Sequence, residues 1–123
     1  MMYRILMLVL LLVALPTATM ACTSDVWTRE KLLKLKAGGF IVIEKEDQPA
    51  VIDQLVLCLA SPDPELRDGI AYEGLSNMLR KNSLNVEQLR NLRARLYLQL
   101  VAEDTDGVSR PFAALMLSEV ART

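Results

Sequence analysis

The stretch from Ser61 to Lys81 constrains the fold more than any other part of the sequence, because it holds the longest well-capped helical pattern. Asp63 followed by Pro64 predicts a helix that starts at Pro64: the carboxylate accepts unpaired amide hydrogens, and proline needs no amide hydrogen in the first turn. With about 3.6 residues per turn, the apolar residues cover more than half of the circumference. They are Leu66, Ile70, Ala71, Gly74, Leu75, Met78 and Leu79, with Ser76 outside this face. A face this broad predicts a helix packed between two or more others.

Two charged residues interrupt this face. Arg67 falls inside the apolar arc and Asp68 lies at its edge. One interpretation is an internal ion pair of Arg67, either with Asp63 one turn back or with a carboxylate of an adjoining helix. The other is a binding groove lined by Arg67, Asp68, Tyr72 and Glu73.

Two glycines also stand inside the same helical pattern, Gly69 and Gly74. Glycine costs about 0.5–1 kcal/mol relative to alanine in a helix interior, so its presence there indicates a close approach by another helix or by a ligand. Of the two, we expect close helix packing.

The N-terminus predicts export. Arg4 supplies a positive charge, and Ile5 to Leu15 form an apolar run of eleven residues that ends before Pro16. This run is shorter than the roughly 18 apolar residues that a membrane-spanning helix requires. We therefore interpret residues 1–21 as a signal peptide and expect the protein in the bacterial periplasm or anchored to a membrane; a buried N-terminal core helix is the alternative.

The two cysteines leave several outcomes open. Residues 19–22, with Cys22 last, are similar to a loose bacterial lipobox in which this cysteine carries the lipid, whereas ordinary cleavage after Ala21 gives the same start without a lipid. In an oxidising compartment, Cys22 could also form a bridge to Cys58, which lipidation of Cys22 excludes. We expect Cys58 to be buried as a small apolar residue.

The rest of the chain predicts four further helices separated by polar turns. Thr28 is an N-cap for a helix that buries Leu32, Leu33 and Leu35; Gly39 then suits a left-handed C-terminal cap that returns Phe40 onto Leu35. Asn85 and Ser109 are expected to cap the last two helices. The first and third of these helices are expected at 29–37 and 86–102. The second is expected to start at Asp47 or Gln48 and to end at Ser61-Pro62, and the last to follow Ser109 and run to Thr123.

Composition excludes several kinds of chemistry. The 123 residues include no histidine and only two cysteines, so the common zinc sites and the Ser-His and Cys-His catalytic arrangements cannot be assembled. We predict no metal site and no cofactor. A modest basic region includes Arg90, Arg93 and Arg95, but it lacks the aromatic residues that accompany single-stranded nucleic-acid sites, so we interpret it as a solvated helix face and expect no nucleic-acid partner.

A weak repeat predicts the architecture. Shifting the sequence by 42 residues superimposes two patterns of helix, acidic turn and helix. The matched pairs include Leu55 with Tyr97, Leu59 with Val101, Ile70 with Phe112, Ala71 with Ala113 and Leu75 with Leu117. Periods of about 40–47 residues are typical of HEAT and armadillo repeats. We therefore predict an all-α fold of antiparallel helical pairs in a short HEAT-like or armadillo-like solenoid, with a compact helical bundle as the alternative.

Two motifs, SPDPELRDGIAYEGLS and GVSRPFAALMLSEVART, together with LLKLKAGGF, resemble the uncharacterised bacterial domain-of-unknown-function family 2785. The resemblance extends from Trp27 to Thr123 and implies an all-helical, HEAT-like chain with no established biochemical activity. Gly69 stands where an acidic residue is common in that family. The second half of the family's pattern, with its histidine-containing motifs, has no counterpart here.

We therefore expect a short polar linker at 22–27 and one helical domain at 28–123, truncated at its C-terminal end. The first functional hypothesis is an exported module that binds a protein partner through Arg67, Asp68, Tyr72, Glu73 and Arg110, with self-association through its uncapped C-terminal face. The alternative is the N-terminal fragment of an enzyme whose catalytic residues lie in a missing C-terminal half, which leaves enzymatic activity uncertain but not favoured.

Overall fold

The computed structural model describes residues 22–42 and 44–123, and within these ranges all regular structure is helical. The helices are α1 (Arg29–Ala37), α2 (Gln48–Cys58), α3 (Glu73–Arg80), α4 (Val86–Val101) and α5 (Ser109–Ala121), with a short 3-10 turn η1 (Lys45–Asp47) and a π-helical segment η2 (Glu65–Tyr72). Because η2 continues directly into α3, the two form one central helix. The prediction of an all-α fold is confirmed, whereas the signal-peptide prediction for 1–21 lies outside the described residues.

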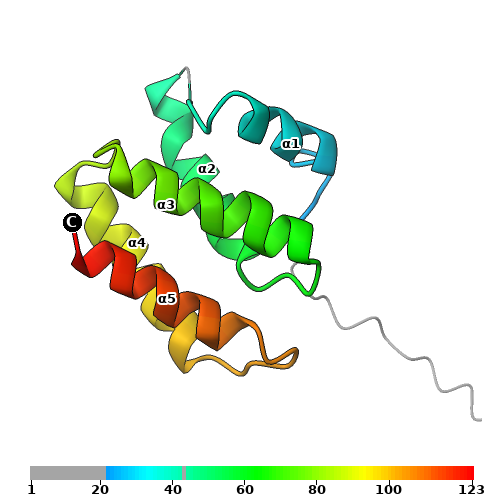
Figure 1. The fold of residues 1–123 in the computed structure, drawn as a ribbon, viewed down its shortest axis with the longest axis vertical. Coiled ribbons are helices and arrows are strands. Elements are labelled where there is room, and N and C mark those ends of the chain that lie inside the picture. Colours follow the sequence, from blue (N-terminus) through cyan, green and yellow to red (C-terminus); the bar gives the residue numbers. More distant parts are fainter. Residues whose placement is uncertain (1–21, 43) are drawn as a thin grey trace, which may run out of the picture.

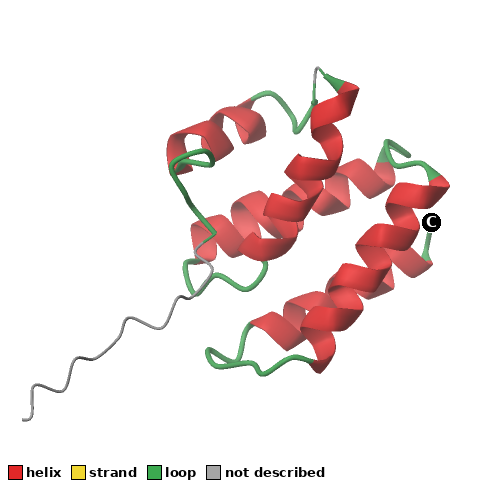
Figure 2. Cartoon of the chain, turned by 180° about the vertical axis from the view of Figure 1, so that it is seen from behind, coloured by secondary structure: helices red, strands yellow, loops and turns green. Residues whose placement is uncertain are grey.

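The helices form two layers (Figure 1). The central helix and α5 lie side by side in one layer, and α2 and α4 lie in the layer behind them. Each rear helix is joined by a short connection to the front helix that follows it in the chain, as the view from behind also shows (Figure 2). α1 contacts η2 on the side of the central helix that faces away from α5.

The central helix begins where the sequence predicted. The Oδ1 atom of Asp63 accepts the backbone N–H of Glu65 at 3.0 Å, and the backbone carbonyl of Asp63 accepts the N–H of Arg67 at 2.9 Å. The expectation of a uniform α-helix is wrong, however, because Glu65–Tyr72 is π-helical. Segments of π-helix are rare, and they are frequently found at functional sites.

The apolar face of the central helix is buried as predicted, from Leu66 to Leu79. Ser76 is buried as well, although the sequence placed it on the open side of the helix. Contacts from both α2 and α5 explain the difference, because they cover a wider arc of α3 than the apolar residues alone indicate.

α1 has the predicted bounds and the predicted start, with the Thr28 hydroxyl oxygen accepting the N–H of Lys31 at 3.1 Å. Leu32 is fully buried, but Leu33 is 39% exposed because α1 packs on one side only, so its predicted burial is wrong. After Gly39, with φ of 72°, the backbone N–H of Phe40 donates to the carbonyl of Leu35 at 2.9 Å. The predicted return of the chain at the end of α1 is therefore confirmed.

The ring of Phe40 lies against the backbone of Gly74. A Cβ atom added at Gly74 would be 2.8 Å from the Cδ1 and Cε1 atoms of Phe40 and 3.2 Å from the Cδ1 atom of Leu55. At Gly69, the added atom would instead meet the Nζ atom of Lys36 at 3.2 Å, the end of a flexible side chain. The close approach expected at Gly74 is confirmed, but the nearest group is Phe40 from the segment after α1, with Leu55 of helix α2 next. At Gly69 no helix packs as closely.

Burial shows that the repeat register changes between the two layers. In the front layer, Ala71 and Ala113 are both fully buried, as the offset of 42 residues requires. In the rear layer, Leu55 is fully buried but Tyr97, its predicted counterpart, is 60% exposed; the fully buried Leu96 shows that an offset of 41 fits there. The loop after α4 is longer than the loop after α2, which accounts for the extra residue.

Replacing Gly74 with alanine is expected to destabilise the protein by about 1–2 kcal/mol. Overpacking against Phe40 outweighs the gain of about 0.5–1 kcal/mol in helix propensity. Urea unfolding followed by circular dichroism measures this difference. Gly69→Ala is the matched control, and we expect it to be neutral or stabilising because Lys36 can move aside.

The loss should shrink when Phe40→Leu is combined with Gly74→Ala, because the smaller side chain makes room for the new methyl group. If the two substitutions destabilise the protein additively, the contact between Phe40 and Gly74 does not set the distance between these segments.

Candidate functional site

Three of the five residues predicted to form an interaction surface come together beside Phe112 of α5. The Cζ atom of Arg67 lies 4.9 Å from the centre of the Phe112 ring, and the Tyr72 ring meets the same ring edge-on, with the centroids 5.9 Å apart at 88°. Arg67 also pairs with Asp68, Nε to Oδ1 at 2.8 Å. We call Arg67, Asp68, Tyr72 and Phe112 the seam cluster, because it lies where the central helix meets α5.

The arginine of this cluster is mostly buried and stabilises the packing of the central helix against α5. Its side chain is only 14% exposed, whereas that of Asp68 is 51% exposed. Stacking of Arg67 on an aromatic ring contributes roughly 0.5–2 kcal/mol, and the Tyr72–Phe112 pair about 0.5–1.5 kcal/mol. Neither predicted ion pair of Arg67 is observed: Asp63 binds Arg29. The carboxylate that binds Arg67 is that of Asp68, the next residue in the chain, and not one from an adjoining helix. What the cluster presents to solvent is therefore the Asp68 carboxylate beside a partly exposed tyrosine.

The other two predicted residues lie outside the cluster. Glu73 pairs with Lys36 of α1, Oε2 to Nζ at 3.2 Å, and remains about half exposed. Arg110 donates from Nε and Nη2 to the carbonyl oxygen of Ala102, at 3.2 and 2.9 Å, and so satisfies the end of α4. The structure thus gives Arg110 a capping role at the end of α4 and Glu73 an ion pair with α1.

A carboxylate that the sequence analysis did not single out starts α5. Asp104 accepts the backbone N–H groups of Ser109 and Arg110, each at 3.1 Å. These hydrogen bonds, that from Arg110 first, hold the pKa of the Asp104 carboxyl below its usual value. The prediction that Ser109 caps this helix is wrong, because Asp104 reaches across the turn from five residues earlier.

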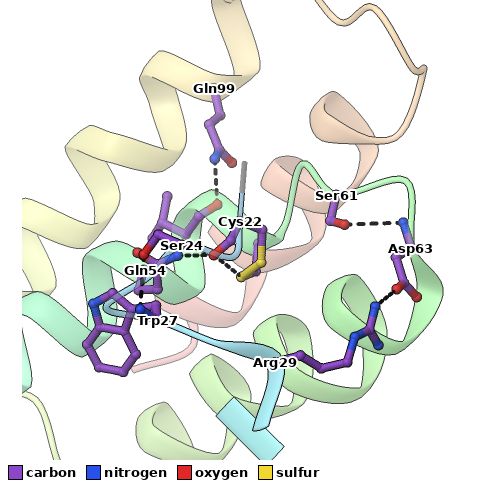
Figure 3. The surroundings of a disulfide bond; sticks show 10 residues. Cys22, Ser24, Trp27, Arg29, Gln54, Ser61, Asp63 and Gln99 are labelled. Atoms are coloured by element: carbon purple, nitrogen blue, oxygen red, sulfur yellow. Dashed lines mark hydrogen bonds and ion pairs between the residues drawn. A yellow bond between two sulfur atoms is a disulfide. The ribbon is translucent and has the colours of Figure 1, made fainter. Parts of the chain in front are cut away.

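The N-terminal segment is fastened to the core by a disulfide bond between Cys22 and Cys58, the last residue of α2 (Figure 3). The amide of Gln54 donates to the carbonyl oxygen of Cys22, and Gln99 of α4 donates to the carbonyl of Val56 at 2.6 Å. Cys58 is buried as predicted, but it is bonded. This bond and the lipid expected at Cys22 exclude each other, since a lipidated cysteine has no free thiol to oxidise.

A second attachment lies at the start of the central helix. Arg29 at the start of α1 binds both Asp63 and Glu65, the latter from Nη1 to Oε1 at 2.7 Å. The hydrogen bond from Arg29, followed by that from the Glu65 backbone, keeps the pKa of the Asp63 carboxyl below its usual value. The same two carboxylates raise the pKa of Arg29, with Asp63 the larger cause.

A cleft of about 480 Å³ opens at this end of the molecule. Its walls are Cys22 and Ser61 on one side and the acidic loop that contains Glu103, Asp104 and Asp106 on the other. Within the described ranges, no three or more acidic or cysteine side chains converge to hold a metal ion, and no helix is both long and apolar enough to cross a bilayer.

Sequence reasoning missed Phe112 and Asp104 as partners of the predicted residues. The repeat pairs Phe112 with Ile70 and so indicated that Phe112 lies on the apolar side of its helix. Nothing in the pattern indicated that its ring contacts Arg67 and Tyr72. Asp104 lies within an acidic turn, and its distance from Ser109 hides its capping role. Comparisons with protein-family models, curated proteins and solved structures find no match to this chain.

We expect Cys22 and Cys58 to be linked in the native protein. Peptide mapping by mass spectrometry without reductant should recover one cross-linked pair of peptides, which separates after reduction. With a sequence separation of 36 residues, the bond should stabilise the fold by about 3–4 kcal/mol against urea unfolding. An alkylated Cys58 and a lipid-bearing Cys22 in unreduced native protein would contradict this prediction.

Asp104→Asn should lower the free energy of unfolding at neutral pH, and this free energy should then fall less steeply as the pH is lowered. Because the pKa of Asp104 is lowered by folding, its contribution is present above the unfolded value of about 3.9 and is lost as the pH falls through the folded pKa. Urea unfolding of wild type and variant should therefore converge in strong acid. Asp25→Asn is the control, since Asp25 is exposed and makes no side-chain hydrogen bond to a described residue. If the free energy of unfolding of Asp104→Asn is lower than that of wild type by the same amount at every pH, the carboxylate is not the cause.

Proposed function

We propose that this protein is an exported helical module that binds another protein through the seam cluster and the neighbouring Glu73. The observation that carries the proposal is the π-helical segment η2, which contains Arg67, Asp68 and Tyr72. A π-helix is rare and is frequently found at functional sites, so its occurrence next to partly exposed aromatic and acidic side chains favours recognition.

The chemistry of the surface suits binding. Asp68 and Glu73 offer exposed acceptors, and Tyr72 adds a rigid aromatic side chain of the kind that dominates binding energy in interfaces. The guanidinium of Arg67 is already stacked on Phe112 and paired with Asp68. We therefore propose a partner segment that brings a basic side chain to these carboxylates.

Export is supported by two independent features. The N-terminal run at 5–15 has the length and flanks of a secretion signal, and the Cys22–Cys58 bond suits an oxidising compartment. The HEAT-like architecture and the resemblance to family 2785 are likewise part of the proposal; two stacked antiparallel pairs support the former. A lipid on Cys22 is the alternative that the Cys22–Cys58 bond argues against, because a lipidated cysteine could not form this bond.

A matched pair of double variants tests the binding surface. Purified protein is used as bait for envelope extract from the producing organism, and Tyr72→Ala with Glu73→Ala should reduce capture of the specific partner at least tenfold. Tyr97→Ala with Glu87→Ala changes the same residue types on α4 and should leave capture intact. Circular dichroism verifies that both variants are folded. Equal capture by wild type and the first variant would remove the seam cluster from the proposal.

A further inference from the structure

The two sulfur atoms of the disulfide bond differ in access. Cys58 is fully buried, whereas Cys22 is 8% exposed and lines the cleft of about 480 Å³ that opens beside Ser61. Thiol–disulfide exchange requires an attacking thiolate to reach one of the two sulfur atoms. Because Cys58 is not part of the cleft wall, a thiol that enters the cleft meets the bond at Cys22.

Among the described residues that line this cleft, every charged one is acidic. They are Glu103, Asp104 and Asp106, which all lie in the loop between α4 and α5. None of the three forms an ion pair with a described residue. Arg110 offsets part of the charge of Asp104, but it lies outside the cleft wall and donates to the carbonyl of Ala102. The approach to the disulfide therefore has a negative potential.

The small size of the cleft keeps this charge effective in salt. A cleft of this volume is roughly 8 Å across, which is less than the Debye length of about 10 Å at 0.1 M salt. Clefts lined by charges of one sign attract ions of the opposite sign and repel ions of the same sign. A thiolate that carries a second negative charge is therefore repelled more strongly than one that carries an ammonium group.

We propose that Cys22 is a site of thiol–disulfide exchange and that the acidic cleft selects thiols that carry a positive charge. The sulfur of such a thiolate bonds to the Sγ atom of Cys22 while the bond to Cys58 breaks, and the electron pair goes to the Sγ atom of Cys58, which takes up a proton. A second thiolate then attacks the sulfur of the bound thiol and releases Cys22. Two thiols are oxidised to one disulfide, and the protein gains two electrons and two protons.

The residues around the bond favour its closing again after exchange. The amide of Gln54 donates to the carbonyl oxygen of Cys22, so this hydrogen bond holds residue 22 on α2 without the disulfide. The same oxygen lies 3.7 Å from the Sγ atom of Cys58, so a thiol formed there has an acceptor. Exchange at Cys22 is therefore reversible, and it determines whether the N-terminal segment is covalently attached to α2.

This exchange site goes beyond the proposed function, since it shares no residue with the seam cluster or with Glu73. Either proposal can fail alone: loss of partner capture concerns Tyr72 and Glu73, whereas loss of thiol selectivity concerns Cys22 and the loop at 103–106.

Reduction of the disulfide-bonded protein by two small thiols tests the proposal. Cysteamine carries an ammonium group, and mercaptoethanesulfonate, of similar size, carries a sulfonate. Each rate is divided by the rate of the same thiol with the neutral disulfide of mercaptoethanol. We expect the normalised rate of cysteamine to be higher by about tenfold or more at low salt, and this ratio to fall several-fold at about 1 M salt. Equal normalised rates at low salt, or no reduction by either thiol, overturn the proposal.

A double variant of the acidic loop tests the cause of the selectivity. Glu103→Gln with Asp106→Asn keeps Asp104, which starts α5, and should reduce the ratio of normalised rates by about threefold or more at low salt. Glu46→Gln with Glu87→Gln is the matched control. These two exposed residues lie at the starts of α2 and α4, at the opposite ends of these helices from the cleft, so the ratio should stay unchanged. A ratio that the loop variant leaves at the wild-type value overturns the selection by the acidic cleft.

The point of attack is identified by peptide mapping. Samples quenched in acid early in the reaction with cysteamine should carry the added thiol on Cys22. An added thiol found on Cys58 instead overturns the assignment of Cys22 as the exchange site.

Discussion

The contact between Phe40 and Gly74 determines how close the N-terminal part of the chain comes to the central helix. A side chain at position 74 would occupy the space of the Phe40 ring, so glycine is the residue that fits at this position. Phe40 reaches this place because the chain reverses at Gly39 immediately after α1. Removal of Phe40 from water therefore fixes the end of α1, the packing of α3 and the position of Leu55 in α2 in a single step.

The start of the central helix is fixed by covalent and ionic links at the same end of the molecule. The Cys22–Cys58 bond ties the N-terminal segment to α2, and Arg29 binds Asp63 and Glu65 where η2 begins. The ion pairs of Arg29 hold the first turn of η2 in place. The same segment carries Arg67 and Tyr72 to Phe112, so the seam cluster depends on how this end is secured.

Local signals in the sequence were sufficient for most of the helices but not for the site. Thr28, Asp63 and Asn85 act on amide groups within three residues, and each was identified correctly because capping is a local interaction. The partners of Arg67 and Arg110 were not, because Phe112 lies on a different helix and Ala102 comes before a turn whose path no local rule fixes. The π-helical geometry of η2 was missed for a related reason: the residues Glu65–Tyr72 also satisfy an α-helical pattern.

The shift of repeat register determines which side chains the second helical pair buries and which it exposes. The front helices keep an offset of 42 residues and the rear helices one of 41, so α5 presents Phe112 to the central helix while α4 turns Tyr97 outwards instead of burying it as Leu55 is buried. With an offset of 42 in both layers, Tyr97 would take the place of Leu96 in the core. One additional residue in the loop before α5 is therefore enough to keep Phe112 against the central helix while Tyr97 stays exposed on α4.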